Sequence, residues 1–142
     1  MDSWDRIAGR DKPAKGERAA TAHRLDDDET VVGRLPAVAV RQSDDGRTVM
    51  DGTVIALVTD RRLILLHSTG GFRPEWSALT LPFGHLEPPI EGDAAPNRVR
   101  VPTSGRRGYL IDADGPAGAD RLATTVAQAL THYRRERMGL PD

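Results

Sequence analysis

The stretch from Gly52 to His67, GTVIALVTDRRLILLH, constrains the fold more than any other part of the chain, because a polar block separates two apolar runs in it. In a single helix, the apolar stripe through Leu57 would continue onto Arg61, which does not fit a buried face. The runs VIALV and LILL are rich in residues that favour strands, and Asp60 can start a turn between them. The stretch therefore predicts a β-hairpin and a core made mainly of strands.

The residues before this hairpin predict one more long strand, VVGRLPAVAVR, which starts at Val31. Pro36 within it indicates an edge strand or a strand start, because proline has no amide hydrogen to donate. The turn SDDG ends with the dipeptide Asp45–Gly46, a strong hairpin signal. The chain then resumes as a strand at Thr48, bends near Gly52 and enters the hairpin. We expect three consecutive antiparallel strands, a meander.

Four shorter strands are expected further along the chain. In the first of them, Leu79, Leu81 and Phe83 alternate onto one face. The second is a weaker candidate, since Pro88 and Pro89 interrupt it. In the third, basic and apolar residues alternate, which predicts one wet and one buried face. The expected strands cover residues 78–83, 86–90, 98–101 and 109–111.

The last segment changes to a helical period. Pro116 and Asp120 prepare the start of a helix of roughly five turns, and Gly139 and Pro141 stop it. The apolar face of this helix must dock on another element, and the preceding sheet is the simplest one. The apolar residues at helical spacing are Leu122, Val126, Leu130 and Tyr133.

Length and composition fit one domain preceded by a charged tail. The chain has 142 residues. Residues 1–28 mix charge with Gly, Pro and Ala, which predicts a mobile tail with a short helix around Glu17 to Leu25. We expect the domain itself over 29–138 and a second short tail over 139–142.

The charge and cysteine content exclude several classes of function. The 20 basic and 21 acidic residues nearly cancel, so no overall field attracts nucleic acid, and no nucleic-acid partner is expected. The chain has no cysteine, which excludes disulfides and thiolate metal sites. Its start is too charged for a signal peptide and its apolar runs are too short for a membrane span. We therefore expect a cytoplasmic protein.

No motif of an enzyme or of a cofactor site stands out. The tripeptide His85–Glu87 has the H-x-E form of zinc deaminases, but the cysteines that would hold the metal are missing. The chain has no G-x-S-x-G, no P-loop, and no G-x-G-x-x-G after a strand. The four histidines fall in four different predicted elements. We expect no catalytic residue, no metal and no cofactor.

The order of elements, seven short strands and one C-terminal amphipathic helix, resembles the pleckstrin-homology-like (PH-like) superfold. The segment ALVTDRRLILL resembles the strand–turn–strand signature of bacterial PH-like and GRAM domains. The segment LTLPFGHLEPP resembles their next landmark, an apolar strand that runs into a proline. This resemblance covers about Glu29 to Arg137. It implies a mainly β fold with one C-terminal α-helix, in which a bent antiparallel seven-strand barrel is capped by the helix.

PH-like domains bind inositol lipids, phosphopeptides, proline-rich segments or other subunits, so the resemblance alone does not select a ligand. Our leading hypothesis is a non-catalytic binding module that engages a protein partner, or a second copy of itself. The contact would use a sheet edge, which is a template for strand addition, or the loops near Trp76. Trp76 is the candidate partner contact. The other interpretation of this indole is that it covers one opening of the barrel.

The alternative hypothesis is a peripheral membrane or anionic-ligand-binding domain that uses an arginine patch. Arg61 and Arg62 at the predicted hairpin tip would form its centre, because guanidinium groups bind phosphate and carboxylate well. The pair Arg106–Arg107, between two glycines, is a second candidate of the same kind. A solvated Arg61 and an Arg62 packed along the sheet are the simpler interpretation of the two residues. Asp44–Asp45 would also repel phosphate at the first hairpin. The arginines that would join the patch are Arg41, Arg47 and Arg73.

Overall fold

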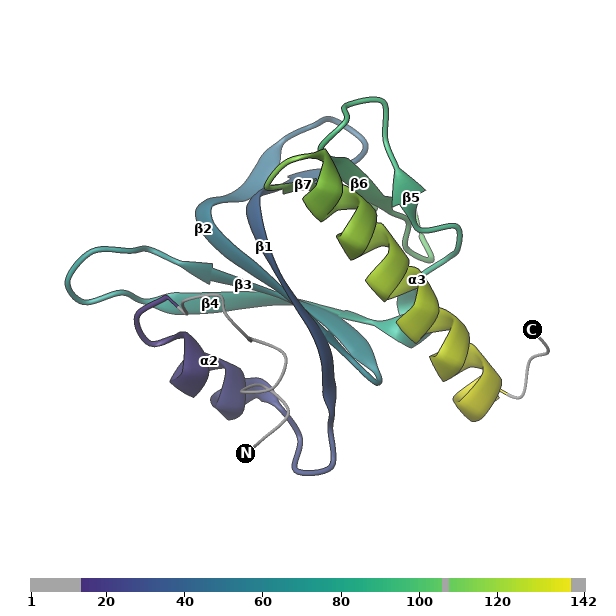
Figure 1. Ribbon diagram of the computed structural model, residues 1–142, viewed down its shortest axis with the longest axis horizontal. Helices are drawn as coiled ribbons and strands as arrows, with labels where there is room; N and C mark the ends of the chain where they lie inside the picture. The colour runs from purple at the N-terminus through teal and green to yellow at the C-terminus, as the bar shows by residue number, and fades with distance from the viewer. Residues whose placement is uncertain (1–13, 106–107, 139–142) are drawn as a thin grey trace.

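The structure, a computed structural model, describes residues 14–105 and 108–138, and its strands form one antiparallel sheet with a helix on each side (Figure 1). The strands lie in the order β4-β3-β2-β1-β7-β6-β5. Seven antiparallel strands followed by a long C-terminal helix confirm the fold class expected from the sequence. The elements are α2 (Glu17–Arg24), β1 (Val31–Gln42), β2 (Thr48–Thr59), β3 (Arg62–Ser68), β4 (Trp76–Pro82), the 3-10 helix η1 (Phe83–His85), β5 (Glu91–Gly92), β6 (Arg98–Val101), β7 (Tyr109–Ala113) and α3 (Pro116–Met138).

The hairpin expected from the sequence is formed by β2 and β3, which pair in continuous register. Its turn is closed by Thr59, whose Oγ1 accepts hydrogen bonds from the backbone N–H groups of Arg61 (3.1 Å) and Arg62 (3.0 Å). Asp60, which we expected to start the turn, accepts a hydrogen bond from the N–H of Thr30 (3.1 Å) instead. Both side chains therefore hold backbone groups, and the turn is tied to the residues that precede β1.

β1 accommodates a proline inside a long strand. It pairs with β2 along most of its length, but with β7 only from Ala37 onward. Pro36 thus lies in the half of β1 that is a sheet edge. An edge position tolerates proline, because the absent amide hydrogen has no neighbouring strand to bond there. The expectation of an edge position is confirmed for this half, although residues 37–42 lie between two strands.

The fifth strand lies elsewhere than the sequence predicts. β5 (Glu91–Gly92) pairs with β6, whereas the expected segment 86–90 contributes only an isolated bridge between Leu86 and Thr103. The two consecutive prolines of that segment have no amide hydrogen, so they cannot donate to a ladder. The expectation of a strand over 86–90 is therefore wrong, and pairing begins just after the prolines.

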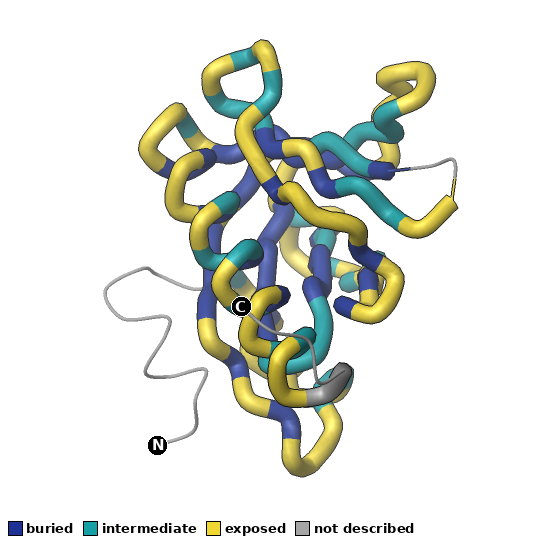
Figure 2. Tube along the Cα trace, turned by 90° about the vertical axis from the view of Figure 1, so that its right-hand side faces the viewer, coloured by how far each residue is buried: buried dark blue, intermediate teal, exposed yellow. Residues whose placement is uncertain are grey.

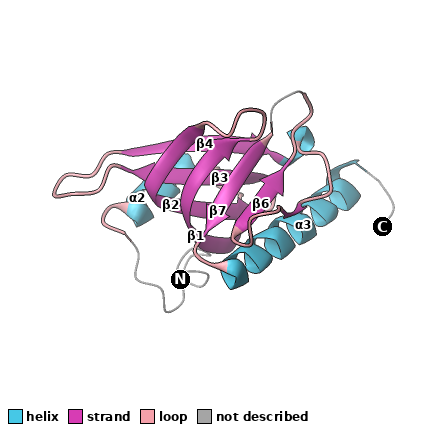
Figure 3. Cartoon of the chain, turned by 90° about the horizontal axis from the view of Figure 1, so that it is seen from above, coloured by secondary structure: helices cyan, strands magenta, loops and turns pink. Residues whose placement is uncertain are grey.

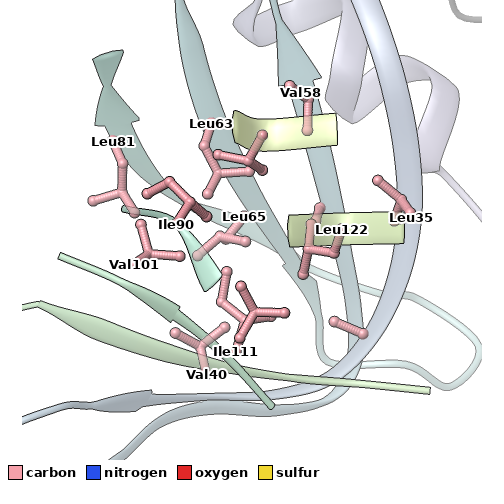
Figure 4. Close-up of a cluster of buried hydrophobic side chains, with 14 of the residues drawn as sticks. Leu35, Val40, Val58, Leu63, Leu65, Leu81, Ile90, Val101, Ile111 and Leu122 are labelled. Carbon is pink, nitrogen blue, oxygen red and sulfur yellow. The ribbon is translucent and has the colours of Figure 1, made fainter. Parts of the chain in front are cut away.

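α3 buries the face that the sequence predicts. Leu122, Val126 and Leu130 are buried in the main core, and Figure 4 shows Leu122 among the side chains of the strands. Tyr133, three residues further along, packs at 72° against the ring of Phe83, with 5.7 Å between the ring centroids. Most of the length of α3 therefore packs on the inner side of the sheet.

Gly33 on β1 sets how closely α3 approaches the sheet. A Cβ atom at this position would lie 2.7 Å from Cγ2 of Thr125 on the helix. Side-chain atoms do not approach one another so closely, so strand and helix meet here only because residue 33 has no side chain.

A second hydrophobic cluster lies on the outer face of the sheet, on the side of α2 (Figures 1 and 3). The strands β2 and β3 are thus covered on both faces. Figure 2 shows that the buried segments lie in the middle of the molecule and that many of the loops are exposed. This double coverage explains why VIALV and LILL are continuous apolar runs without alternation. The outer cluster consists of Val31, Ile55, Leu57, Ile64 and Leu66, with Leu25 and Trp76 packed against it.

A buried ion pair attaches α2 to the sheet. Arg34 on β1 donates from Nε and Nη2 to the two carboxylate oxygens of Glu17, at 2.6 and 2.7 Å. The Arg34 and Glu17 side chains are 3% and 0% exposed. Residues 14–28 of the expected tail therefore form a helix and a turn against the sheet, and α2 lies where the sequence predicts a short helix. Residues 1–13 and 139–142 lie outside the described residues.

Candidate functional site

The arginine pair at the β2–β3 turn is neutralised by the segment that precedes β1. Arg62 donates from Nε to Oε2 of Glu29 at 2.8 Å, and its Nη2 also donates to Oε1 of the same carboxylate. The hydroxyl of Thr59 donates to Oε2 at 2.6 Å. Burial alone would raise the pKa of Glu29, but the hydrogen bonds from Arg62 and Thr59 outweigh it and hold this pKa below its ordinary value.

Arg61 is engaged by three aspartates. Its Nη1 lies 3.2 Å from Oδ1 of Asp28 and 3.3 Å from Oδ2 of Asp26, and its Nε lies 3.6 Å from Oδ1 of Asp60. The hydrogen bond to Asp28 raises the pKa of Arg61, and the charge of Asp60 adds to this effect. Carboxylates of the same chain therefore stand where an anionic ligand would bind.

A second charge cluster joins β1, β6 and β7 at Asp112. Arg98 donates from Nε to Oδ1 of Asp112 at 2.6 Å, and Arg41 donates from Nε to Oδ2 at 3.0 Å. Burial would raise the pKa of Asp112, but the hydrogen bonds from Arg98 and Arg41 outweigh it and lower this pKa. Arg41 is thus held by the sheet, away from the β2–β3 turn.

The structure does not bring the five candidate arginines into one patch. Arg61 and Arg62 lie at one end of β3, and Arg73 is exposed in the loop at its other end. Arg41 pairs across the ladder with Thr48, near the opposite end of β1, and Arg47 is exposed in the turn beside it. Arg106 and Arg107 lie outside the described residues. Ligand binding by these side chains stays a prediction.

Trp76 begins β4 and is partly covered by α2 and the residues before it. Its indole Nε1 donates to the carbonyl of Lys15 at 3.1 Å, and its ring packs on the outer hydrophobic cluster. The side chain of Lys15 reaches Phe72, where Nζ donates to the carbonyl at 2.6 Å and lies 4.6 Å from the ring centroid. Phe72 itself is 82% exposed. A partner contact by Trp76 stays a prediction, and Phe72 is the more accessible aromatic of the two.

β4 has a free edge. Hydrogen bonds from Thr69 N–H to the Glu75 carbonyl and from Phe83 N–H to the Arg61 carbonyl, both 3.0 Å, show that odd-numbered residues of this segment bond to β3. The register of β3 and β4 has no shift, so the even-numbered residues point their backbone groups away from β3. Within the described part of the chain, no partner meets the outward groups of Ala78 and Thr80.

The ends of this edge are less available than its middle. The carbonyl of Trp76 accepts a hydrogen bond from Nη2 of Arg24 at 3.2 Å. Pro82 has no amide hydrogen, which suits its outward position on an edge strand. The open part of the edge is therefore centred between Ala78 and Thr80.

A groove of about 320 Å³ lies beside the C-terminal half of β4. Residues of β4 form one wall, and residues of η1, the β6–β7 loop and β7 form the other. A strand added to β4 would run along this groove, so side chains of that strand would have space beside the sheet. The lining residues are Thr80, Leu81, Pro82, His85, Thr103, Ser104 and Tyr109.

We searched the described residues for metal sites and for membrane-spanning helices. Over 14–105 and 108–138, no group of three or more His, Cys, Asp or Glu side chains is placed to hold a metal ion. Of the helices in the same ranges, none combines the length and the apolar character needed to cross a membrane.

Comparison with solved structures finds the same fold in proteins of very different sequence. The chain is similar to the Vps36 N-terminal PH domain, with a TM-score of 0.59 and 11% identity over 75% of this chain and 83% of that one. The fold is PH-like. The chain is also similar to a p115-RhoGEF structure with linker, DH and PH domains, with a TM-score of 0.57 and 12% identity over 89% of this chain and 36% of that one. No family model matches the sequence, and no curated protein does.

Proposed function

We propose that this PH-like chain is a non-catalytic binding module that engages a protein partner through the free edge of β4. The observation that carries this proposal is the pair of outward backbone positions, Ala78 and Thr80, on an uncharged strand at the end of the sheet. Main-chain hydrogen bonds to such an edge give affinity, and a neighbouring groove gives selectivity. Phe72, in the loop before β4, is exposed and offers an apolar contact to a partner.

The arginine patch gives less support to an anionic ligand. Arg61, Arg62 and Arg41 each form an ion pair with a carboxylate of the same chain. A phosphate would have to displace these carboxylates from the arginines. The carboxylates also cancel the positive charge that would attract a phosphate. We therefore rank binding of proteins above binding of anionic lipids.

The proposal is tested by capture from cells of the source organism with three forms of the protein as bait. Thr80→Pro removes the outward N–H while leaving the hydrogen bonds of β4 to β3 in place. Thr80→Val keeps that N–H and the branched shape of the side chain, and serves as the matched control. We expect partners to be retained by the parent and Thr80→Val, and lost from Thr80→Pro. Equal retention by all three would show that β4 is not the binding edge.

A further inference from the structure

We propose that the partner of β4 is β4 of a second copy of the chain, paired antiparallel around a two-fold axis at Leu79. This inference rests on the proposed function, because it names the occupant of the same edge. Exposed edge strands commonly carry charges or bulges that prevent pairing with another chain. β4 has seven residues, WSALTLP, with no charged side chain, and its pairing with β3 is regular.

Two incomplete positions on the edge select the register. Pro82 has no N–H to donate, and the carbonyl of Trp76 already accepts a hydrogen bond from Arg24. When the axis passes through Leu79, residue 76 of one copy lies opposite residue 82 of the other. Pro82, which cannot donate, then faces the Trp76 carbonyl, which already has a donor. No hydrogen bond between the two copies is lost at this pair.

The same register pairs the two open positions with each other. Ala78 of one copy lies opposite Thr80 of the other, and each such pair exchanges two N–H···O=C hydrogen bonds. With the axis at Ala78, the N–H of Thr80 would meet the occupied carbonyl of Trp76. With the axis at Thr80, the carbonyl of Ala78 would meet Pro82, which cannot donate. The edge is therefore complementary to itself at Leu79, and less so one residue to either side.

The side chains agree with this register. Leu79 is half-buried and packs against the main core from the inner face of the sheet. In the dimer the two Leu79 residues would be directly opposite, as a non-hydrogen-bonded pair with Cα atoms about 4.5 Å apart. This contact would bury the remaining exposed part of each leucine and join the two cores across the axis. On the outer face, Ala78 would meet Thr80, so no like charges are opposed.

Single cysteines test the register directly, because the natural chain has none. Two opposed residues about 4.5 Å apart suit a disulfide, so mild oxidation is expected to convert most of Leu79→Cys into a covalent dimer on a non-reducing gel. Ala78→Cys and Thr80→Cys are the controls, because each would be about 7–8 Å from its own symmetry mate on the diagonal and should stay monomeric. Cross-linking of a control as fast as Leu79→Cys would overturn the register.

Light scattering on a sizing column tests the association itself without changing Leu79. At high concentration the parent and Thr80→Val are expected at twice the chain mass of 15.4 kDa, and Thr80→Pro at the chain mass. Thermal unfolding of each form checks that it is folded. A parent that stays monomeric, or a dimer that survives in Thr80→Pro, would overturn self-pairing. If the parent is monomeric while cellular capture still depends on the N–H of Thr80, another protein occupies the edge and the proposed function stands.

Discussion

Glu29 lies at the junction of three segments, and its charge depends on all of them. Its side chain is 0% exposed, and it accepts hydrogen bonds from Arg62 beyond the turn and from Thr59 at the end of β2. A buried carboxylate keeps its charge only when such donors replace the water it has lost. Glu29 therefore ties the segment before β1 to the β2–β3 turn, a role that the acidic run 26–29 did not reveal in the sequence.

The lowered pKa of Glu29 predicts an acid-sensitive stability. A pKa below the ordinary value of 4.5 in the folded state means that the unfolded chain takes up the proton first as the pH falls. The stabilisation is complete above about pH 4.5 and is lost as the pH falls through the folded-state value. Glu29→Gln is expected to unfold about 2 kcal/mol more easily at neutral pH and to show a shallower loss on acidification. Urea unfolding at pH 7 and at several lower values measures both.

Asp112 provides the comparison for this prediction. Its pKa is lowered by Arg98 and Arg41 in a different part of the sheet. Asp112→Asn should therefore also make the loss of unfolding free energy on acidification shallower, independently of Glu29→Gln. Identical pH profiles for the parent and both variants would contradict this account.

At the scale of elements, a buried pair of charges joins α2 to the sheet. Arg34 points to the outer side of β1, where the carboxylate of Glu17 accepts two hydrogen bonds from it. Removing one partner of a buried ion pair costs much more than removing both together. This attachment makes α2 part of the same packed unit as the sheet.

Glu17→Gln is expected to lower the free energy of unfolding by about 3 kcal/mol, because it removes the negative charge that faces the buried Arg34 guanidinium. The double variant Glu17→Leu/Arg34→Met replaces the pair with apolar side chains and should recover most of the loss. Urea unfolding followed by circular dichroism compares the three proteins. A Glu17→Gln variant as stable as the parent would mean that the Glu17–Arg34 ion pair contributes little to stability.

The sequence predicts the elements better than their partners, for a physical reason. Period and turn residues are local, so the hairpin of β2 and β3, the strands β6 and β7, and the face of α3 could be assigned from neighbours in the chain. The ion pairs Glu17–Arg34 and Glu29–Arg62 join residues far apart, and no local pattern marks them. One signal was available: VIALV and LILL are apolar on both faces, which requires a cover on each side of the sheet.

The candidate site divides in the same way. The strand pattern of β4 can be read from neighbouring residues in the chain. Its position as the last strand of the sheet depends on the topology of all seven strands. The arginines were recognisable as residues, whereas their carboxylate partners were not. The only trace of this pairing in the sequence is that two adjacent arginines, Arg61 and Arg62, are matched by a run of four acidic residues, 26–29.

For the whole molecule, charges that are paired internally leave a weak external field, since the formal net charge is −1. We therefore expect that the double variant Arg61→Ala/Arg62→Ala binds acidic lipid vesicles at low salt no more weakly than the parent does. The same double variant should unfold about 2 kcal/mol more easily, because Glu29 loses the two hydrogen bonds from Arg62. Vesicle co-sedimentation and urea unfolding measure the two effects. Salt-sensitive binding that is lost only in the variant would restore the arginine patch as a lipid site.

The contact between Gly33 and Thr125 has a consequence for how chains of this kind can diverge. A methyl group at position 33 has no room while the γ-methyl of residue 125 is present. An alanine at 33 would require a shift of the Thr125 side chain, a smaller residue such as serine, alanine or glycine at 125, or a helix set further from the strand. In a collection of related chains, these two distant positions would therefore be expected to change together, and this correlation would record the distance between β1 and α3.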